Sequence, residues 1–145
     1  MVTMRRMAPA LVGLKLLGLP LVAAAAEPER VVVQHILIAF RKSVPDKQIE
    51  RTKGEARALA EALLERARKG DDFDALVKEF TDDRVPGIML VTNRQAPRVP
   101  GGTPRGGLVQ KFGDVAFQLD VGEVGLANYH AEFCPYGWHV IKRLE

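Results

Sequence analysis

The chain has 145 residues, a net charge of +3 and a single cysteine. This length allows one ordinary domain, and the lone thiol excludes an intramolecular disulfide, so the fold must be held by packing alone. A charge this small and dispersed argues against a nucleic-acid partner.

The first 26 residues have the order of a secretory signal peptide. Met1 to Arg6 is short and basic, Ala8 to Val22 is mostly apolar, and Ala23 to Ala26 supplies small residues for cleavage. The apolar stretch is shorter than the roughly 20 residues that cross a bilayer, so no stable membrane span is expected. We therefore expect a signal peptide over residues 1–26, a mature domain over residues 27–145 and a periplasmic or extracellular location. An uncleaved N-terminal membrane anchor is the alternative.

The first expected strand is Val31 to Phe40, an apolar run rich in β-branched residues. It carries a histidine, His35, in its middle. The polar loop that follows contains Arg41, Lys42 and Arg51. A run of charges in a loop is usually a solvated face, although these charges also offer contacts to acidic groups of a peptide.

Two helices are expected after this loop. Thr52 begins the first, because Thr52-Lys53-Gly54-Glu55 fits a capping box, in which the hydroxyl and the carboxylate satisfy reciprocal backbone amides. Gly70 is its expected C′ residue, and Asp71 or Asp72 caps the second helix. Apolar residues recur at helical spacing on both. They are Ala56, Leu59, Ala60, Leu63 and Ala67 on the first helix, and Phe73, Leu76, Val77 and Phe80 on the second.

Short strands and loops surround one more helix in the second half of the chain. A strand is expected at Gly87–Thr92, and an exposed loop at Asn93–Gly107, which holds three prolines and four glycines. A helix is expected at Val109–Leu119, a brief strand at Val121–Val124 and a closing strand at Trp138–Leu144. This β-α-α-β-α-β-β order in so few residues predicts an α+β domain with a small antiparallel sheet.

The closing strand carries a second histidine, His139. A buried polar ring without a partner is costly, so each strand histidine needs a polar neighbour or a cleft. If the first and last strands are neighbours, His35 and His139 face each other across one sheet. His130 and Cys134 come shortly before, but their spacing matches none of the tight structural zinc patterns, so neither a metal nor another cofactor is expected.

Five segments, in this order, make the chain resemble the parvulin family of peptidyl-prolyl cis/trans isomerases. They are Gln34–Leu37, Phe73–Asp83, Arg105–Phe112, Ala116–Val124 and Tyr136–Glu145. The resemblance implies a four-stranded antiparallel sheet surrounded by helices, with a shallow proline-binding cleft. The chain departs from the family at the second strand, where Pro86-Gly87-Ile88-Met89-Leu90 replaces the usual Gly-Gly-Asp-Leu-Gly, and in a longer loop after it.

The resemblance also implies a set of site residues. His35 and His139 match the paired histidines that the family carries on adjacent central strands. Asp83 falls where members have a cysteine or an aspartate beside the reacting bond. The apolar residues expected to hold the proline ring are Met89, Leu108 and Phe112.

Rotation about an X-Pro bond crosses a barrier of about 18–20 kcal/mol, which comes from amide resonance. A catalyst needs no covalent bond. It must hold the proline ring, remove water from the imide and favour the twisted geometry over the planar ones. Two roles stay open for the histidines: an architectural pair joined by a hydrogen bond, or direct catalysis. For Asp83 we expect an electrostatic role and a hydrogen bond toward His35.

We therefore expect a peptidyl-prolyl isomerase that acts on proline-containing segments of unfolded or folding exported proteins. The alternative is a non-catalytic chaperone module of the same fold, which keeps the proline cleft and has lost turnover. The departures from the family pattern over residues 87–103 keep this alternative open.

Overall fold

The computed structural model describes residue 18 and residues 26–145, so the expected signal peptide lies almost wholly outside the described residues. None of the helices in this described part has the length and apolar character that crossing a bilayer requires. The elements are, in chain order, β1 (Arg30–Ile38), α1 (Lys53–Arg68), α2 (Phe73–Phe80), β2 (Ile88–Thr92), β3 (Thr103–Pro104), the 3₁₀ turn η1 (Arg105–Gly107), α3 (Gln110–Gln118), β4 (Val124–Ala127) and β5 (Trp138–Arg143). The predicted α+β class is confirmed.

One sheet holds the domain together, in the strand order β3-β2-β1-β5-β4. The four longer strands pair antiparallel, as expected. The two-residue strand β3 pairs parallel to β2 and was not predicted, because it lies inside the stretch rich in proline and glycine. The first and last strands of the chain, β1 and β5, are neighbours at the centre of the sheet.

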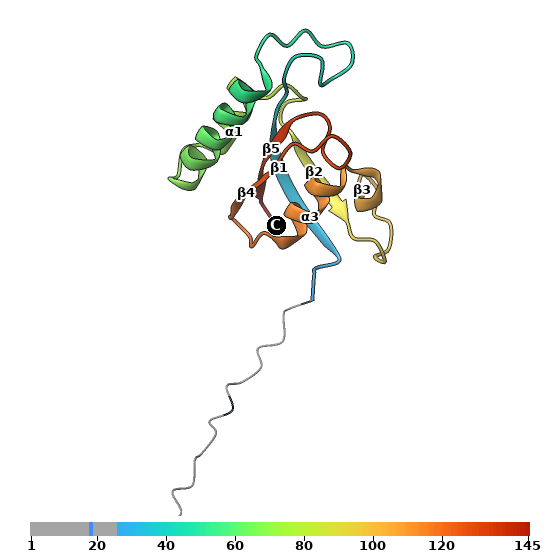
Figure 1. The fold of residues 1–145 in the computed structure, drawn as a ribbon. Helices are drawn as coiled ribbons and strands as arrows, with labels where there is room; N and C mark the ends of the chain where they lie inside the picture. Colours follow the sequence, from blue (N-terminus) through green and yellow to red (C-terminus); the bar gives the residue numbers. More distant parts are fainter. Residues whose placement is uncertain (1–17, 19–25) are drawn as a thin grey trace, which may run out of the picture.

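Helices cover both faces of this sheet (Figure 1). Since side chains alternate along a strand, β1 contributes to two hydrophobic cores. On one face Ile36 and Ile38 pack with α1 and α2, around Leu63 and Phe73. On the other face Val31 and Val33 belong to the core that includes α3, with Phe112 and Phe117. Burying side chains of this kind stabilises a fold by about 1.5–3 kcal/mol each.

The predicted helix ends are confirmed. Thr52 Oγ1 accepts the amide of Glu55 at 3.2 Å, and the amide of Thr52 donates to Glu55 Oε2 at 3.0 Å, so α1 begins with a full capping box. Gly70 follows the last turn with a positive φ of 102°. Asp72 then caps α2 by accepting the amide of Ala75 at 3.2 Å.

Two predicted strands have the wrong limits. The first strand ends at Ile38 and not at Phe40, because the amide of Phe40 donates to the Ser43 hydroxyl and so begins the loop. The brief strand expected at Val121–Val124 starts only at Val124. Gly122, with a φ of 85°, forms a turn before it.

Both ends of the described domain lie at one end of the sheet. In Figure 1 the chain enters at the lower end of β1, and the long loop between β1 and α1 projects from the opposite end. At the entry end, the amide of Val32 donates to the backbone oxygen of Glu145 at 3.1 Å.

Candidate functional site

The two strand histidines lie on the same face of the sheet, one step apart along it. Leu37 pairs with His139 and His35 pairs with Ile141, so the two imidazoles are diagonal neighbours. Their ring centroids are 5.7 Å apart. Phe112 of α3 packs edge-on against both, at 5.1 Å from His35 and 5.3 Å from His139. The prediction that the rings face each other across one sheet is confirmed.

Both nitrogens of His35 face oxygen acceptors. Nδ1 lies 3.1 Å from the backbone oxygen of Gly87, and Nε2 lies 3.2 Å from Oδ2 of Asp83. A carbonyl and a carboxylate both accept hydrogen bonds, so the two contacts are satisfied together only when both ring nitrogens carry hydrogen. The side chain of His35 is only 5% exposed, and the two oxygen partners meet the need of a buried polar ring for hydrogen bonds.

Asp83 reaches His35 because the segment after α2 runs along the edge of β1. Leu37 donates its amide to the hydroxyl of Thr81 at 3.2 Å and accepts the amide of Asp82 at 2.8 Å. The amide of Ala39 donates to the carboxylate of Asp82 at 2.9 Å. These contacts continue the edge of β1 beyond its pairing with β2, and they bring the next residue, Asp83, beside the imidazole.

The carboxylate of Asp83 is ionised over the ordinary pH range. Its hydrogen bond with His35 is the main reason why its pKa falls to about 2, whereas partial burial acts in the opposite direction. The predicted hydrogen bond between these two side chains is thus present. An anionic oxygen lies at the edge of the histidine pair and remains partly exposed.

His139 has quite different surroundings. Neither of its ring nitrogens has a hydrogen-bond partner within the described residues, and burial lowers its pKa to about 3, so the ring is neutral. The architectural role predicted for the histidines, a pair joined by a hydrogen bond between the two imidazoles, is therefore wrong in that hydrogen bond. The nitrogens of His35 are held by Gly87 and Asp83, and the diagonal register leaves His139 against Phe112.

The six residues expected to form the site line one pocket, which we call the histidine pocket. Its volume is about 230 Å³. Its lining residues from the sequence prediction are His35, Asp83, Met89, Leu108, Phe112 and His139. The register explains the place of Met89, since it pairs with Val33 and so lies on the face of the sheet that carries α3.

Three further residues line the histidine pocket and were not predicted: Gly107, Val109 and Tyr136. Tyr136 is an exposed aromatic residue that lies directly before Gly137. A Cβ atom at Gly137 would lie 2.1 Å from the backbone oxygen of Ile38, so only glycine allows this close approach of the loop to β1. The sequence signal that could have identified Tyr136 as a pocket residue is its position beside a glycine and close to His139.

Arg105 fixes the turn that carries Leu108 and is a second feature the sequence did not reveal. Its nearly buried guanidinium donates to Glu27 at 2.7 Å and to Asp114 of α3 at 2.9 Å. Its backbone oxygen accepts the amide of Leu108 at 3.1 Å. One side chain thus connects the start of the domain, the turn η1 and α3.

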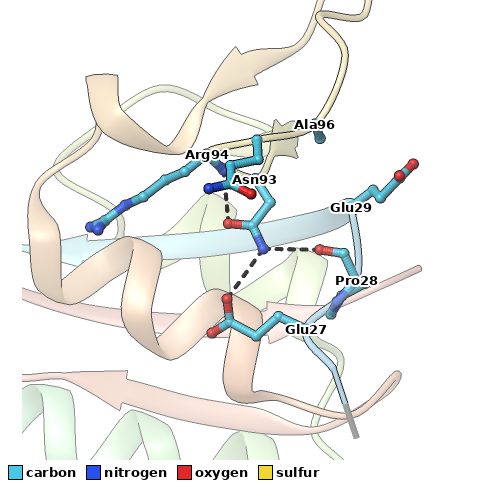
Figure 2. A pocket seen from close by; sticks show the side chains of 7 residues that line it. Glu27, Pro28, Glu29, Asn93, Arg94 and Ala96 are labelled. Atoms are coloured by element: carbon cyan, nitrogen blue, oxygen red, sulfur yellow. Dashed lines mark hydrogen bonds between the residues drawn. The ribbon is translucent and has the colours of Figure 1, made fainter.

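A separate polar pocket lies where the chain enters the domain (Figure 2). Asn93 donates its side-chain amide to the carboxylate of Glu27 at 3.2 Å and to the backbone oxygen of Pro28 at 3.0 Å. The pocket is larger than the histidine pocket, at about 430 Å³. None of the predicted site residues lines it, so we assign it no part in the chemistry.

Basic side chains of the loop after β1 make contacts within the protein. Arg51 pairs with the carboxylate of Asp82 and donates to the backbone oxygen of Ala39 at 2.9 Å. Arg41 donates to the backbone oxygen of Glu50 at 3.0 Å. These two cations therefore help to hold the loop, which favours a structural role for them over recognition of acidic groups.

The residues considered for a metal site have structural surroundings. His130 Nδ1 accepts the backbone amides of Glu132 and Phe133, each at 3.1 Å. Cys134 is buried and donates to the backbone oxygen of Gly137 at 3.4 Å, and burial raises the pKa of its thiol to about 11. Over residue 18 and residues 26–145 there is no cluster of three histidine, cysteine or acidic residues arranged to hold a metal ion.

Comparison with known proteins matches this geometry. The family model of the PPIC-type PPIASE domain matches residues 19–145. The chain belongs to the PPIC-type peptidyl-prolyl isomerase family. The resemblance to parvulin-type isomerases inferred from the sequence is therefore confirmed, and the histidine pocket is the candidate active site of this PPIC-type domain.

Curated relatives of the PPIC-type domain are a foldase and a chaperone. The chain is 32% identical to the foldase protein PrsA of Caldanaerobacter subterraneus subsp. tengcongensis over 75% of this chain and 27% of that protein. It is 33% identical to the chaperone SurA of Chromohalobacter salexigens over 80% of this chain and 23% of that protein. The chain thus spans about a quarter of the length of the curated relatives it matches.

Solved structures share the fold of the PPIC-type domain. The solution structure of TbPIN1 superposes with a TM-score of 0.60 at 19% identity, over 81% of this chain and 98% of that chain. The peptidyl-prolyl isomerase ESS1 of Candida albicans superposes with a TM-score of 0.58 at 25% identity, over 81% and 63% of the two chains.

Proposed function

We propose that the domain over residues 27–145 accelerates rotation about X-Pro bonds in exported proteins by a non-covalent mechanism. The observation that carries this proposal is the histidine pocket, where an apolar wall of Met89, Leu108 and Phe112 meets the ionised Asp83. A foldase and a chaperone among the relatives support unfolded or folding proteins as its substrates.

The apolar wall binds the proline ring and excludes water from the imide. A planar imide places negative charge on its carbonyl oxygen through resonance, and water hydrogen bonds stabilise that charge. The carboxylate of Asp83 disfavours the same charge by repulsion. Both effects raise the free energy of the planar imide relative to that of the twisted imide. Each tenfold acceleration requires that the barrier between them falls by about 1.4 kcal/mol.

The two histidines position these groups. His35 orients the carboxylate through its hydrogen bond, and Gly87 fixes the imidazole from the other side. His139 is neutral and supports Phe112 through an edge-on ring contact at 5.3 Å. No covalent intermediate on Asp83 is required, because the barrier is one of bond rotation.

A protease-coupled proline assay tests this function. The protein should accelerate the cis-to-trans step of a proline peptide, and Leu108→Ala should lower kcat/KM by about tenfold, because one of the three side chains of the apolar wall is truncated. Val121→Ala is the matched control, because Val121 is 63% exposed and does not line the histidine pocket. Its activity should equal that of the unchanged protein.

The alternative is a chaperone module that binds proline peptides and does not turn them over. Binding without acceleration in the same assay contradicts the isomerase proposal and favours this alternative. Export is proposed on the signal-like residues 1–26, and N-terminal sequencing of the exported protein checks it: a mature chain that begins at Glu27 supports cleavage after Ala26.

A further inference from the structure

A second pocket adjoins the histidine pocket, and we call it the loop pocket because the loop from Asp83 to Gly87 and the start of β2 form most of its lining. Its volume is about 390 Å³. His35, Asp83 and Met89 line both pockets. The two pockets are therefore parts of one continuous surface, with the ionised carboxylate of Asp83 at their shared boundary.

The loop pocket exposes apolar side chains. Val85 is 52% exposed and Ile88 is 50% exposed, and both line the loop pocket. Tyr136, another exposed large apolar residue, lines the histidine pocket. Exposed apolar side chains that gather in one place, and not singly over the surface, indicate a binding surface.

The sequence of this chain is unusual at the same place. Ile88 is the third residue of Pro86-Gly87-Ile88-Met89-Leu90, where the family pattern has an aspartate. An apolar residue has thus replaced a charged one beside the active site.

The charges around the loop pocket also limit what binds there. The carboxylate of Asp83 lies 3.2 Å from Nε2 of His35 and is held there, and the guanidinium of Arg84 belongs to an exposed residue of the lining. A positively charged substrate side chain would meet Arg84 and lose its hydration. An uncharged apolar side chain avoids both costs.

We propose that the loop pocket is a subsite for the apolar side chain of the residue that adjoins the proline in the substrate. This inference rests on the proposed function, because the proline itself must occupy the histidine pocket. Consecutive Cα atoms are about 3.8 Å apart, so a neighbour of that proline reaches across the shared wall of His35, Asp83 and Met89.

A peptide series tests the subsite. Leu, Ser or Lys is placed directly before the proline in one set and directly after it in a second set, and kcat/KM is measured for each peptide. At one of the two positions kcat/KM of the Leu peptide should exceed that of the Ser peptide by about fivefold, and the Lys peptide should have the lowest value. Apolar pockets discriminate between side chains by factors of this size. Val85→Ser should reduce this preference for Leu over Ser below about twofold.

Val121→Ser is the matched control, since Val121 is an exposed valine outside both pockets. It should keep the full preference for Leu. Ile88→Ser is the second variant at the loop pocket, and far-ultraviolet circular dichroism checks the folding of all three. Equal kcat/KM for all flanking residues, or a Leu preference that neither Val85→Ser nor Ile88→Ser reduces, overturns the subsite.

Failure of the proposed function gives a different result. If no peptide is accelerated, the isomerase proposal fails, and the same series is compared by dissociation constant in an NMR titration. A preference for Leu that Val85→Ser removes then still supports the subsite. Equal dissociation constants for the Leu and Ser peptides overturn it.

Discussion

His35 and His139 share one face of the sheet and have different polar surroundings. His35 lies between a carbonyl and a carboxylate, which both accept hydrogen bonds. His139 is enclosed by apolar and aromatic neighbours, and its pKa is lowered to about 3 by burial. The first ring is held by two polar contacts, whereas the second has none and stays neutral.

The neutral state of His139 predicts a loss of stability in acid. In the unfolded chain the ring binds a proton below its ordinary pKa of 6.5, whereas in the folded chain it does so only near pH 3. The free energy of unfolding should therefore fall as the pH falls from about 7 to 3, by at most about 1.4 kcal/mol per pH unit from this residue. Urea unfolding between pH 7 and 5 measures it, above the range in which Asp83 titrates.

His139→Phe should remove this part of the pH dependence. The direct check is the nitrogen-15 chemical shift of the ring, which should stay that of a neutral imidazole from pH 8 to pH 5. A ring that becomes protonated above pH 5 contradicts the assignment.

A second prediction at this scale concerns His35. His35→Ala removes the contacts with Gly87 and Asp83 and the edge contact with Phe112, and it should destabilise the fold by about 2–3 kcal/mol. Activity per folded molecule should fall by less than tenfold, because the apolar wall remains. Turnover corrected for the folded fraction measures this. An unchanged melting temperature with abolished activity is the contrary result.

At the scale of elements, contacts distant in sequence hold the pocket wall. The turn η1 and the helix α3 carry Leu108 and Phe112, and Arg105 joins them to the start of the domain. The same start is bound by Asn93, as Figure 2 shows. The residues that precede β1 therefore help to fix the wall of the histidine pocket.

This arrangement predicts a difference between two neighbouring glutamates. Glu27→Gln weakens the ion pair with Arg105 and should lower the free energy of unfolding by about 0.5–1 kcal/mol, since the pair is partly exposed. Glu29→Gln is the matched control, because Glu29 contacts Asn93 through its backbone oxygen. Its effect should be near zero. Urea unfolding of both variants measures the difference, and equal shifts refute the role of Arg105.

At the scale of the whole molecule, local patterns in the sequence predicted most of the fold. The capping box of Thr52 and Glu55, the C′ glycine Gly70 and the cap Asp72 depend only on neighbouring residues, so their signals are legible in the chain. The neighbouring first and last strands were suggested by their two histidines. The family pattern then supplied the set of residues that the structure gathers in one pocket.

Features that depend on contacts across the fold were not predicted. Strand β3 exists only through its pairing with β2. The nearly buried guanidinium of Arg105 is paired with Glu27 and Asp114, which are distant from it in sequence or on another element. The prediction of a hydrogen bond between the two imidazoles failed for the same reason. It depends on the diagonal register of β1 and β5, which is set by the whole sheet.

Cys134 has a practical consequence for work on this protein. It is the single cysteine of the chain, and it is fully buried with a thiol whose pKa is raised to about 11. The thiolate is the reactive form, so maleimides and other alkylating reagents at neutral pH leave this sulfur untouched. A fluorophore or spin label can therefore be attached at the exposed position 85 through Val85→Cys without first replacing Cys134. The signal of this label then reports directly on a peptide that binds in the loop pocket.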